Sequence, residues 1–207
     1  MSDALYYERP VLLNRDMHRH RRVLPSTSYA FARKANSLYL AGVEFNAACK
    51  EYAIVFTRAA DGRTVPVAML GLRSRENLFV DDEGRWSGTY VPAFVRRYPF
   101  VLAELSGQNA GVCIDEAFAG LNEHEGEALF DAQGSNTPFL QNAIDFLQQY
   151  QREYVRTEAF CRRLQDAGLL REMNAKADLV DGRTFTVGSL LVVDEPTLMA
   201  LPDATVL

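Results

Sequence analysis

A long amphipathic segment between Thr137 and Gly168 limits the folds open to this chain. Thr137-Pro138 has the form of a helix start, and Gly168 is of the residue type that commonly follows a helix end. The apolar stripe of the segment consists of Phe139, Ala143, Phe146, Leu147, Tyr150, Tyr154, Phe160, Cys161 and Leu164. Because such a stripe has to be buried, the sequence predicts one long helix over residues 137–167 that covers a sheet.

Strand signals occur both before and after this helix. Apolar, β-rich runs separated by turn signals lie at 52–57, 65–72, 77–80, 85–90, 100–105, 111–114, 175–180 and 185–193. The short connections between most of them favour antiparallel neighbours. We therefore predict an α+β fold in which a twisted, mainly antiparallel sheet from about residue 52 to 115 is covered by helix 137–167. The second β unit, 175–193, either extends that sheet or forms a small one of its own.

The length and composition fit one folded domain. With 207 residues, 48% of them hydrophobic and 24% charged, the chain can bury a sizeable core, and we expect residues 1–207 to form a single domain.

No stretch reaches the roughly 20 apolar residues of a transmembrane helix. Asp3 stands where a signal peptide would carry positive charge, so the expected location is the cytoplasm, with surface association by a non-classical route as the open alternative. Cys49, Cys113 and Cys161 lack metal-type spacing and lie in apolar patterns, so we expect buried free thiols.

Charge is distributed unevenly along the chain. Residues 1–35 carry seven Lys or Arg against three acidic residues, which is +4, so the total of −5 leaves −9 on the remainder. Residues 115–131 hold six acidic residues and no Lys or Arg, which predicts a loop outside the core. We expect the basic N-terminal arm, residues 1–40, to pair with this acidic loop, within one chain or between subunits of a homo-oligomer. The negative body argues against a nucleic-acid partner, although the arm has basic and aromatic residues suited to one.

The stretch from Trp86 to Phe100 reads as a boundary between elements. Pro92 can open a short helix, and Pro99 ends it one turn later, because the residue before a proline is pushed toward extended geometry. In this interpretation the aromatic and aliphatic residues of the turn face the core. Arg96 and Arg97 mark its rim.

This stretch is also the best candidate for a binding surface. Trp, Tyr and Arg are the residue types that carry much of the energy of protein interfaces. The predicted edge of the surface consists of Trp86, Tyr90, Phe94, Arg96, Arg97 and Tyr98. The two arginines could form a fork for a peptide carboxylate. The alternative is that the aromatic residues serve only packing while the arginines pair with the acidic loop.

Motifs for metal binding or catalysis are weak or absent. His18, His20 and His124 are possible metal ligands by type, but their spacing suits solvated or salt-bridged histidines better. Cys113 is the one cysteine worth testing as a nucleophile, and a buried strand thiol is the favoured explanation for it. Neither a nucleophile elbow nor a phosphate-binding glycine loop is present. We expect no cofactor, and a protein or peptide as the partner.

Several segments, taken in order, carry a family resemblance that covers nearly the whole chain. They are PVLLNRDMH, SYAFA, EYAIVF, MLGLR, ENLFVDDEGRW, YVPAFVRRYPF, VCIDE, TPFLQNAIDFLQQY and VVDEPTLMALPD. Together they resemble the SapC family of bacterial proteins, which is named after a surface-layer-associated member. Members of the family usually continue past the closing helix with a further apolar segment, so this chain is either a short variant or lacks a C-terminal element.

The resemblance implies an accessory role more than a reaction. Family members are described as soluble proteins connected with the surface layer or with peptide transport. Their genes tend to lie near those for outer-membrane receptors, tryptophan-halogenase-like flavoproteins and iron-dependent hydroxylase-like proteins. From this we expect a non-catalytic binding protein connected with envelope or peptide-modification systems. The alternative is an enzyme, or a partner of one, that acts on peptide or amino-acid substrates.

Overall fold

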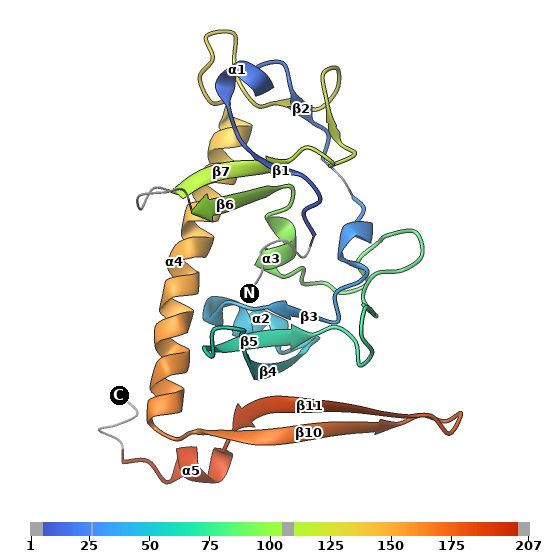
Figure 1. The fold of residues 1–207 in the computed structure, drawn as a ribbon, viewed down its shortest axis with the longest axis vertical. Coiled ribbons are helices and arrows are strands. Elements are labelled where there is room, and N and C mark those ends of the chain that lie inside the picture. Colours follow the sequence, from blue (N-terminus) through green and yellow to red (C-terminus); the bar gives the residue numbers. More distant parts are fainter. Residues whose placement is uncertain (1–5, 26, 105–109, 203–207) are drawn as a thin grey trace. The chain divides into compact units, whose positions relative to one another are not determined.

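The computed structural model describes residues 6–25, 27–104 and 110–202, which fall into two compact units (Figure 1). Unit 1 consists of residues 34–78 and 153–202, and unit 2 of residues 6–33 and 79–152. Each unit is therefore built from two separate stretches of chain. Helix α4, Pro138–Asp166, supplies residues 138–152 to unit 2 and residues 153–166 to unit 1.

The described part of unit 1 contains one antiparallel sheet with the strand order β10-β11-β4-β5-β3. Its strands are β3 Ser37–Tyr39, β4 Ala53–Arg58, β5 Thr64–Met69, β10 Leu170–Asp178 and β11 Thr184–Val193. Two of its hairpins turn at Asp-Gly pairs, where Gly62 and Gly182 take φ of 82° and 85°, a conformation that glycine adopts readily. The β unit predicted at 175–193 thus extends the sheet of β4 and β5 through β11.

Two apolar clusters pack against this sheet, one on each face, since successive strand residues point to opposite sides. Phe56 and Leu191 meet Cys161 and Leu164 of α4 in the first cluster. Val55, Val67 and Leu190 form the second. The C-terminal half of the long helix therefore covers one face of the sheet, as the amphipathic stripe predicts. The short α-helices in the described part of unit 1 are α2, Phe45–Ala48, and α5, Glu195–Met199, and Asp194 caps the start of α5.

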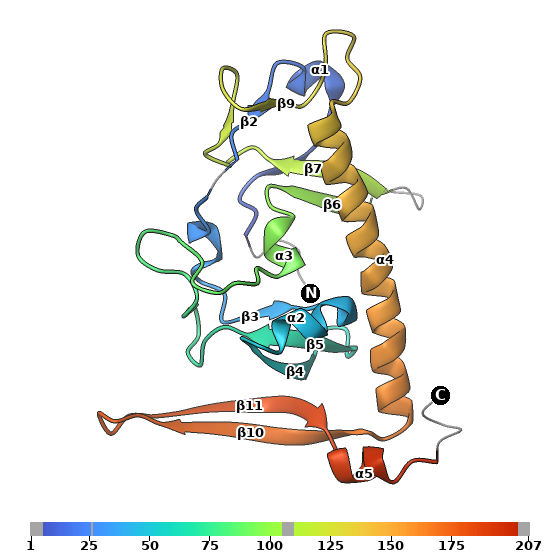
Figure 2. The ribbon, with the colours of Figure 1, turned by 180° about the vertical axis from the view of Figure 1, so that it is seen from behind.

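Unit 2 holds, within its described residues, two three-stranded antiparallel sheets with the orders β1-β7-β6 and β8-β2-β9. The first consists of β1 Pro10–Leu12, β6 Phe100–Glu104 and β7 Ala110–Asp115. The second consists of the two-residue strands β2 Arg22–Val23, β8 Leu121–Asn122 and β9 Glu127–Ala128. The short α-helices in the described part of unit 2 are α1, Arg15–His18, and α3, Ala93–Arg96. Figure 2 shows the same elements from behind.

The core of unit 2 joins both sheets to the N-terminal half of α4. Its buried members are Val23, Phe100, Ile114, Phe118, Leu129, Phe130, Leu140 and Leu147. The Thr137 hydroxyl accepts the Leu140 N–H at 3.3 Å and donates to the Ala128 carbonyl at 2.6 Å, which caps the helix and ties its start to β9. No helix among the described residues is long and apolar enough to cross a membrane.

The α+β class, the antiparallel pairing and the long helix are confirmed, but the expected single sheet over residues 52–115 is not. β4 and β5 belong to the sheet of unit 1, whereas β6 and β7 belong to a sheet of unit 2. β3 and β1, both from the N-terminal region, pair with β5 and β7. Residue patterns predict where strands occur but not which edges pair.

The strands expected at 77–80 and 85–90 reduce to a turn with a single bridge between Val80 and Trp86. The Asp81 carboxylate accepts the backbone N–H groups of Glu83 and Arg85 at 3.0 and 2.8 Å. These bonds are local and fix a tight turn without requiring a ladder of paired strands. The turn signal was therefore interpreted correctly and the flanking strands were not.

The acidic segment 115–131 was expected to lie outside the core, and this expectation is wrong. Phe118, Leu129 and Phe130 are buried members of the core of unit 2. β8 and β9, which flank its most acidic part, pair with β2. The prediction counted the charges of the segment and overlooked its three large apolar residues. The free energy gained by burying these side chains keeps the segment in the core, while the carboxylates between them stay exposed.

Candidate functional site

The candidate site of unit 2 is built around α3, the single turn that the prolines of the segment predict. The carbonyl of Pro92 accepts the N–H groups of Val95 and Arg96 at 2.9 and 3.1 Å. Phe94 and Val95 are buried, as expected, while Arg96 is exposed. The short helix therefore presents a guanidinium group outward and anchors itself by its apolar side.

A pocket of about 390 Å³ lies beside α3, and all of its lining residues belong to unit 2. The lining consists of Val23, Pro25, Ser28, Tyr29, Phe31, Val95, Arg96, Arg97, Tyr98, Pro99, Phe100, Phe118, Phe139, Asn142, Ala143 and Phe146. Its volume is within the usual range of ligand pockets, about 300 to 1,000 Å³. Stretches that are distant in sequence meet at this pocket.

The walls of the pocket are mainly aromatic. Seven lining residues carry rings, namely Tyr29, Phe31, Tyr98, Phe100, Phe118, Phe139 and Phe146. Phe31 stacks on Tyr98 with ring centroids 4.2 Å apart and planes at 25°, and Tyr98 meets Phe118 edge-on at 5.4 Å. Such rings favour an apolar or aromatic guest, which they can contact by face or by edge.

The charge at the pocket has one sign. Arg96 and Arg97 are lining residues, and none of the described lining residues is an Asp or Glu. Arg96 Nε donates to the Val91 carbonyl at 3.0 Å, and its guanidinium carbon lies 5.1 Å from the ring centroid of Phe146. No ion pair of Arg96 is found in the part of the chain that the structure describes. An anionic group at the pocket mouth would therefore meet a guanidinium already held in place.

Arg97 lies in the core, and its predicted position on the rim is wrong. Only 6% of the residue is exposed. Its guanidinium carbon lies 4.1 Å from the ring centroid of Phe94, 5.2 Å from that of Tyr150 and 6.0 Å from that of Tyr7. Residues three apart share a helix face, so Arg97 follows the buried Phe94 inward. The spacing of three between Phe94 and Arg97 was visible in the sequence, but we placed Arg97 on the rim because its side chain is charged.

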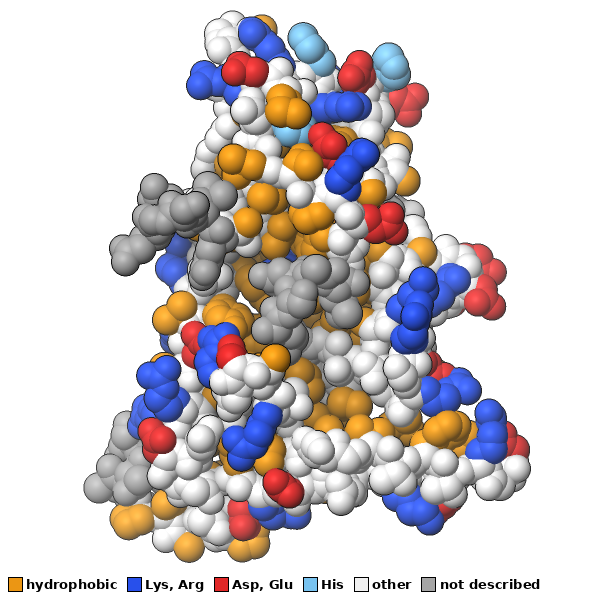
Figure 3. Space-filling view, in the orientation of Figure 1, with side chains coloured by type: hydrophobic (Ala, Val, Ile, Leu, Met, Phe, Trp, Pro, Cys, Tyr) orange, Lys and Arg blue, Asp and Glu red, His pale blue; other side chains and the backbone are white. Residues whose placement is uncertain are grey.

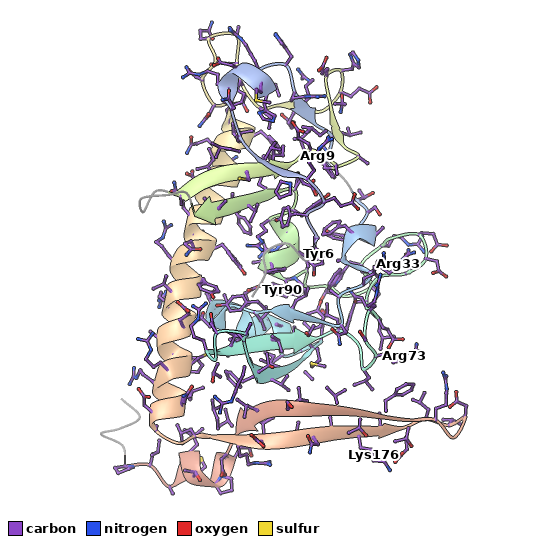
Figure 4. All side chains as sticks on the ribbon, viewed as in Figure 1. Tyr6, Arg9, Arg33, Arg73, Tyr90 and Lys176 are labelled. Carbon is purple, nitrogen blue, oxygen red and sulfur yellow. The ribbon has the colours of Figure 1, made fainter. Side chains whose placement is uncertain are left out.

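The other predicted surface residues support the pocket from outside it. Trp86 meets Tyr29, a lining residue, edge-on at 5.7 Å. The Tyr90 ring, labelled in Figure 4, has its centroid 6.0 Å from the Arg96 guanidinium carbon. Phe94 is 4% exposed and packs edge-on against Tyr6 at 5.6 Å. Of the six predicted residues, Arg96, Arg97 and Tyr98 line the pocket. The other three, Trp86, Tyr90 and Phe94, contact lining residues or their neighbours from outside it.

Asp115 holds the segment that bears Tyr98. This residue is 0% exposed, and its Oδ1 accepts the backbone N–H of Arg9 at 2.9 Å and of Ala117 at 3.0 Å. Its Oδ2 accepts the N–H of Glu8 at 3.1 Å and the Tyr98 hydroxyl at 3.3 Å. Burial, together with the Asp115 carboxylate, raises the pKa of Tyr98, so the hydroxyl remains a donor. Asp115 was counted among loop charges, whereas it is a structural carboxylate.

The pairing of the basic arm with the acidic loop is found within unit 2. Arg9 forms an ion pair with Glu116 at 3.2 Å, and Arg21 forms one with Glu123 at 3.5 Å. β2 lies between β8 and β9, so backbone bonds add to these charges. Figure 3 shows basic, acidic and histidine side chains gathered over α1 and β2. These arginines of the arm are thus matched by the protein itself.

The histidines lie apart from this pocket. His18 is 1% exposed, with Nδ1 2.9 Å from the Asn14 carbonyl oxygen and Nε2 3.6 Å from Glu116 Oε1. His20 and His124 are exposed. No cluster of three or more His, Cys, Asp or Glu suited to a metal occurs in the described ranges.

The cysteines differ from one another in exposure. Cys113 and Cys161 are buried free thiols, as expected, and burial raises the pKa of both, that of Cys161 to about 11. A raised pKa keeps the thiol protonated and unreactive, which favours the structural interpretation of Cys113. Cys49 is exposed, contrary to expectation, because the helix it follows is only one turn long.

Sequence reasoning missed most of the pocket walls. Phe139, Asn142, Ala143 and Phe146 lie at helical spacing and form one face of α4. The apolar members of this face were assigned to the stripe that covers a sheet, and Asn142, a polar residue within it, is the signal that was available. Phe118 was missed because the acidic segment that contains it was assigned to a loop outside the core.

Comparison with known proteins identifies a family. The SapC family model matches residues 13–207. No curated protein and no solved structure matches the chain.

Proposed function

The chain belongs to the SapC family, and we propose that unit 2 is a non-catalytic binding module for a protein or peptide segment that presents an aromatic side chain beside a carboxylate. The observation that carries this proposal is the pocket itself. Aromatic rings wall it, an exposed Arg96 lies at its edge, and no described lining residue is acidic.

The aromatic walls account for the apolar part of the ligand. A phenyl or indole group that enters the pocket would leave water and contact rings from distant stretches of the chain. Aromatic pairs contribute about 0.5 to 1.5 kcal/mol each beyond the burial of their area. The stacked pair of Phe31 and Tyr98 is already ordered by its own packing and by the bond from Tyr98 to Asp115. Little side-chain entropy would therefore be lost on binding.

Arg96 accounts for the carboxylate. Its Nε is held by the Val91 carbonyl, and its guanidinium group lies over the ring of Phe146. The remaining N–H groups can donate a bidentate pair to a carboxylate. Because the side chain is fixed before binding, this contact adds specificity at low entropic cost.

Two small probes that differ in one group test the proposal. N-acetyl-L-phenylalanine and N-acetyl-L-phenylalaninamide share the ring and the amide, and only the first carries a carboxylate. Trp86 is the single tryptophan of the chain and contacts Tyr29 of the pocket wall, so its fluorescence reports on occupancy. The acid should bind at least about tenfold more tightly than the amide, as expected for a charge-assisted hydrogen bond.

Variants separate the pocket from general charge effects. Arg96→Ala should reduce the affinity for the acid to that for the amide. Arg152→Ala removes an exposed arginine of α4 outside the lining and should change nothing. Equal binding of acid and amide to the wild-type protein, or no saturable response to either, contradicts the proposal.

A further proposal concerns the role of this module. On the family resemblance, we place it as an accessory protein that holds a peptide for an envelope or peptide-modification system. Capture of interacting proteins with the wild-type chain and with Arg96→Ala tests this role. A partner that is retained by the first and lost by the second supports it, and a set of partners that is unchanged argues against it.

A further inference from the structure

β10 is one of the two edge strands of the unit 1 sheet. It pairs with β11 on one side, and its other side has no partner strand among the described residues. Figures 1 and 2 show β10 and β11 extending as a two-stranded ribbon, and β11 meets β4 only near Leu191. An edge of nine residues with unpaired backbone groups is a template for another strand.

The hydrogen bonds at both ends of β10 show which residues face this free edge. The Asp194 N–H donates to the Leu169 carbonyl at 2.9 Å, and the Leu179 N–H donates to the Arg183 carbonyl at 2.7 Å. Bonded and non-bonded pairs alternate along an antiparallel ladder. Odd-numbered residues of β10 therefore bond to β11, and the N–H and C=O groups of residues 170, 172, 174, 176 and 178 point outward.

An irregularity in the hairpin leaves this alternation intact. Met173 pairs with Leu190 and Ala175 pairs with Val187, so β10 advances by two residues while β11 advances by three. The extra residue lies in β11, where Ser189 takes a positive φ of 59°. β10 thus keeps a regular outer edge across its whole length.

The charged side chains along this edge match those of a second, antiparallel copy of β10. In a two-fold pair of antiparallel β10 strands, outward-facing residues must meet outward-facing residues, so even positions pair with even positions. When the axis passes through Asn174, Glu172 of each copy lies opposite Lys176 of the other. Cross-strand pairs of opposite charge stabilise a sheet and like charges destabilise it.

The registers within two residues of this one lack the match. An axis at Ala175 places Glu172 opposite Asp178, an axis at Glu172 or Lys176 places like residues opposite each other, and an axis at Met173 makes no pair of opposite charges. In the single chain, Lys176, which is labelled in Figure 4, pairs with Asp178 at 3.0 Å, and both side chains are 62% exposed. A surface ion pair of this kind contributes little to stability, so Lys176 can exchange Asp178 for a carboxylate of a second copy.

We propose that β10 is a homotypic docking edge, at which a second copy of this chain pairs antiparallel about Asn174 and continues the unit 1 sheet. This inference is independent of the pocket in unit 2. A lysine at the centre of an edge strand ordinarily blocks sheet extension. Here Glu172 of the second copy neutralises it, which makes the edge selective for its own sequence.

Charge exchange tests the pairing by sedimentation over a range of protein concentrations. The wild-type protein should dimerise, and K176E should weaken the dimer about tenfold, because Glu172 then faces another carboxylate at two symmetric places. The double variant E172K/K176E should restore the wild-type dissociation constant. K50E, which reverses an exposed charge of unit 1 outside β10, should leave it unchanged.

A cysteine at the two-fold axis tests the register. In a C49S background, which removes the exposed native thiol, N174C should form an intermolecular disulfide under mild oxidation. Paired Cα atoms in such a ladder are about 5.5 Å apart, a distance that suits a disulfide. K176C, whose partner would be Glu172, should not crosslink. A monomeric wild-type protein, a charge exchange that fails to restore dimers, or equal crosslinking of both cysteine variants would overturn the proposal.

Discussion

Arg97 is surrounded by the rings of Phe94, Tyr150 and Tyr7, whereas the guanidinium of Arg96 faces solvent over Phe146 and Tyr90. A desolvated cation above an aromatic face contributes about 2 kcal/mol or more, and an exposed one about 0.5 to 1 kcal/mol. Two adjacent residues of one type therefore have different roles. Arg97 holds the segment in place, and Arg96 is available to a ligand.

Substitution of each arginine should separate these roles. Arg97→Ala should lower the free energy of unfolding by about 2 to 4 kcal/mol, since it removes a buried side chain and its contacts with three rings. Arg96→Ala should change the free energy of unfolding by no more than about 0.5 kcal/mol. Urea unfolding followed by Trp86 fluorescence measures both. Equal losses for the two variants would mean that Arg96 is also structural.

At the scale of elements, Asp115 joins the residues that enter β1 to the end of β7. Its two oxygens accept three backbone N–H groups and the Tyr98 hydroxyl. A buried carboxylate with this number of donors is stable only while all of them remain in place. The edge of the β1-β7-β6 sheet and the aromatic wall of the pocket are thus fixed by one side chain.

A graded series of variants tests this arrangement. Asp115→Ala leaves three backbone N–H groups without their acceptor and should lower the free energy of unfolding by at least about 3 kcal/mol. Asp115→Asn keeps one accepting oxygen and should lose less. Tyr98→Phe removes a single hydrogen bond and should lose about 1 kcal/mol. The order can be read from thermal or urea unfolding, and a Tyr98→Phe loss as large as that of Asp115→Ala would be inconsistent with this account.

Elements governed by local chemistry could be predicted from the sequence. Pro92 and Pro99 placed α3, and Thr137-Pro138 placed the start of α4. Strand partners could not be predicted, because edge pairing depends on contacts between distant stretches. The pocket is a similar case. Arg96 and Tyr98 were identified from composition, but Phe31, Phe118 and Phe146 reach it only through tertiary structure.

At the scale of the whole molecule, the two units share one continuous helix. α4 gives Leu140 and Leu147 to the core of unit 2, and Cys161 and Leu164 to a cluster in unit 1. Neither unit is a continuous stretch of sequence. Unfolding of one unit would release part of the helix that the other requires, so we expect the two units to unfold together.

We therefore predict one cooperative unfolding transition. Trp86 fluorescence reports on unit 2, and the reactivity of the buried thiol of Cys161, measured in a C49S/C113S background, reports on unit 1. The two probes should give the same urea midpoint. Gln151→Pro, in the middle of α4, should lower both midpoints, since an interior proline costs about 3 kcal/mol. Midpoints that differ in the wild-type protein would show two independent domains.

The central claim is that the aromatic pocket of unit 2 binds a ring that carries a carboxylate, and photolabelling tests it most directly. N-acetyl-p-benzoyl-L-phenylalanine crosslinks to side chains around its ring on irradiation, and mass spectrometry locates the adducts. We expect adducts within residues 23–31, 95–100 and 139–146, three stretches that line the pocket. An excess of N-acetyl-L-phenylalanine should suppress them, and Arg96→Ala should reduce them. Adducts confined to unit 1, or spread over the surface and insensitive to the competitor, would contradict the claim.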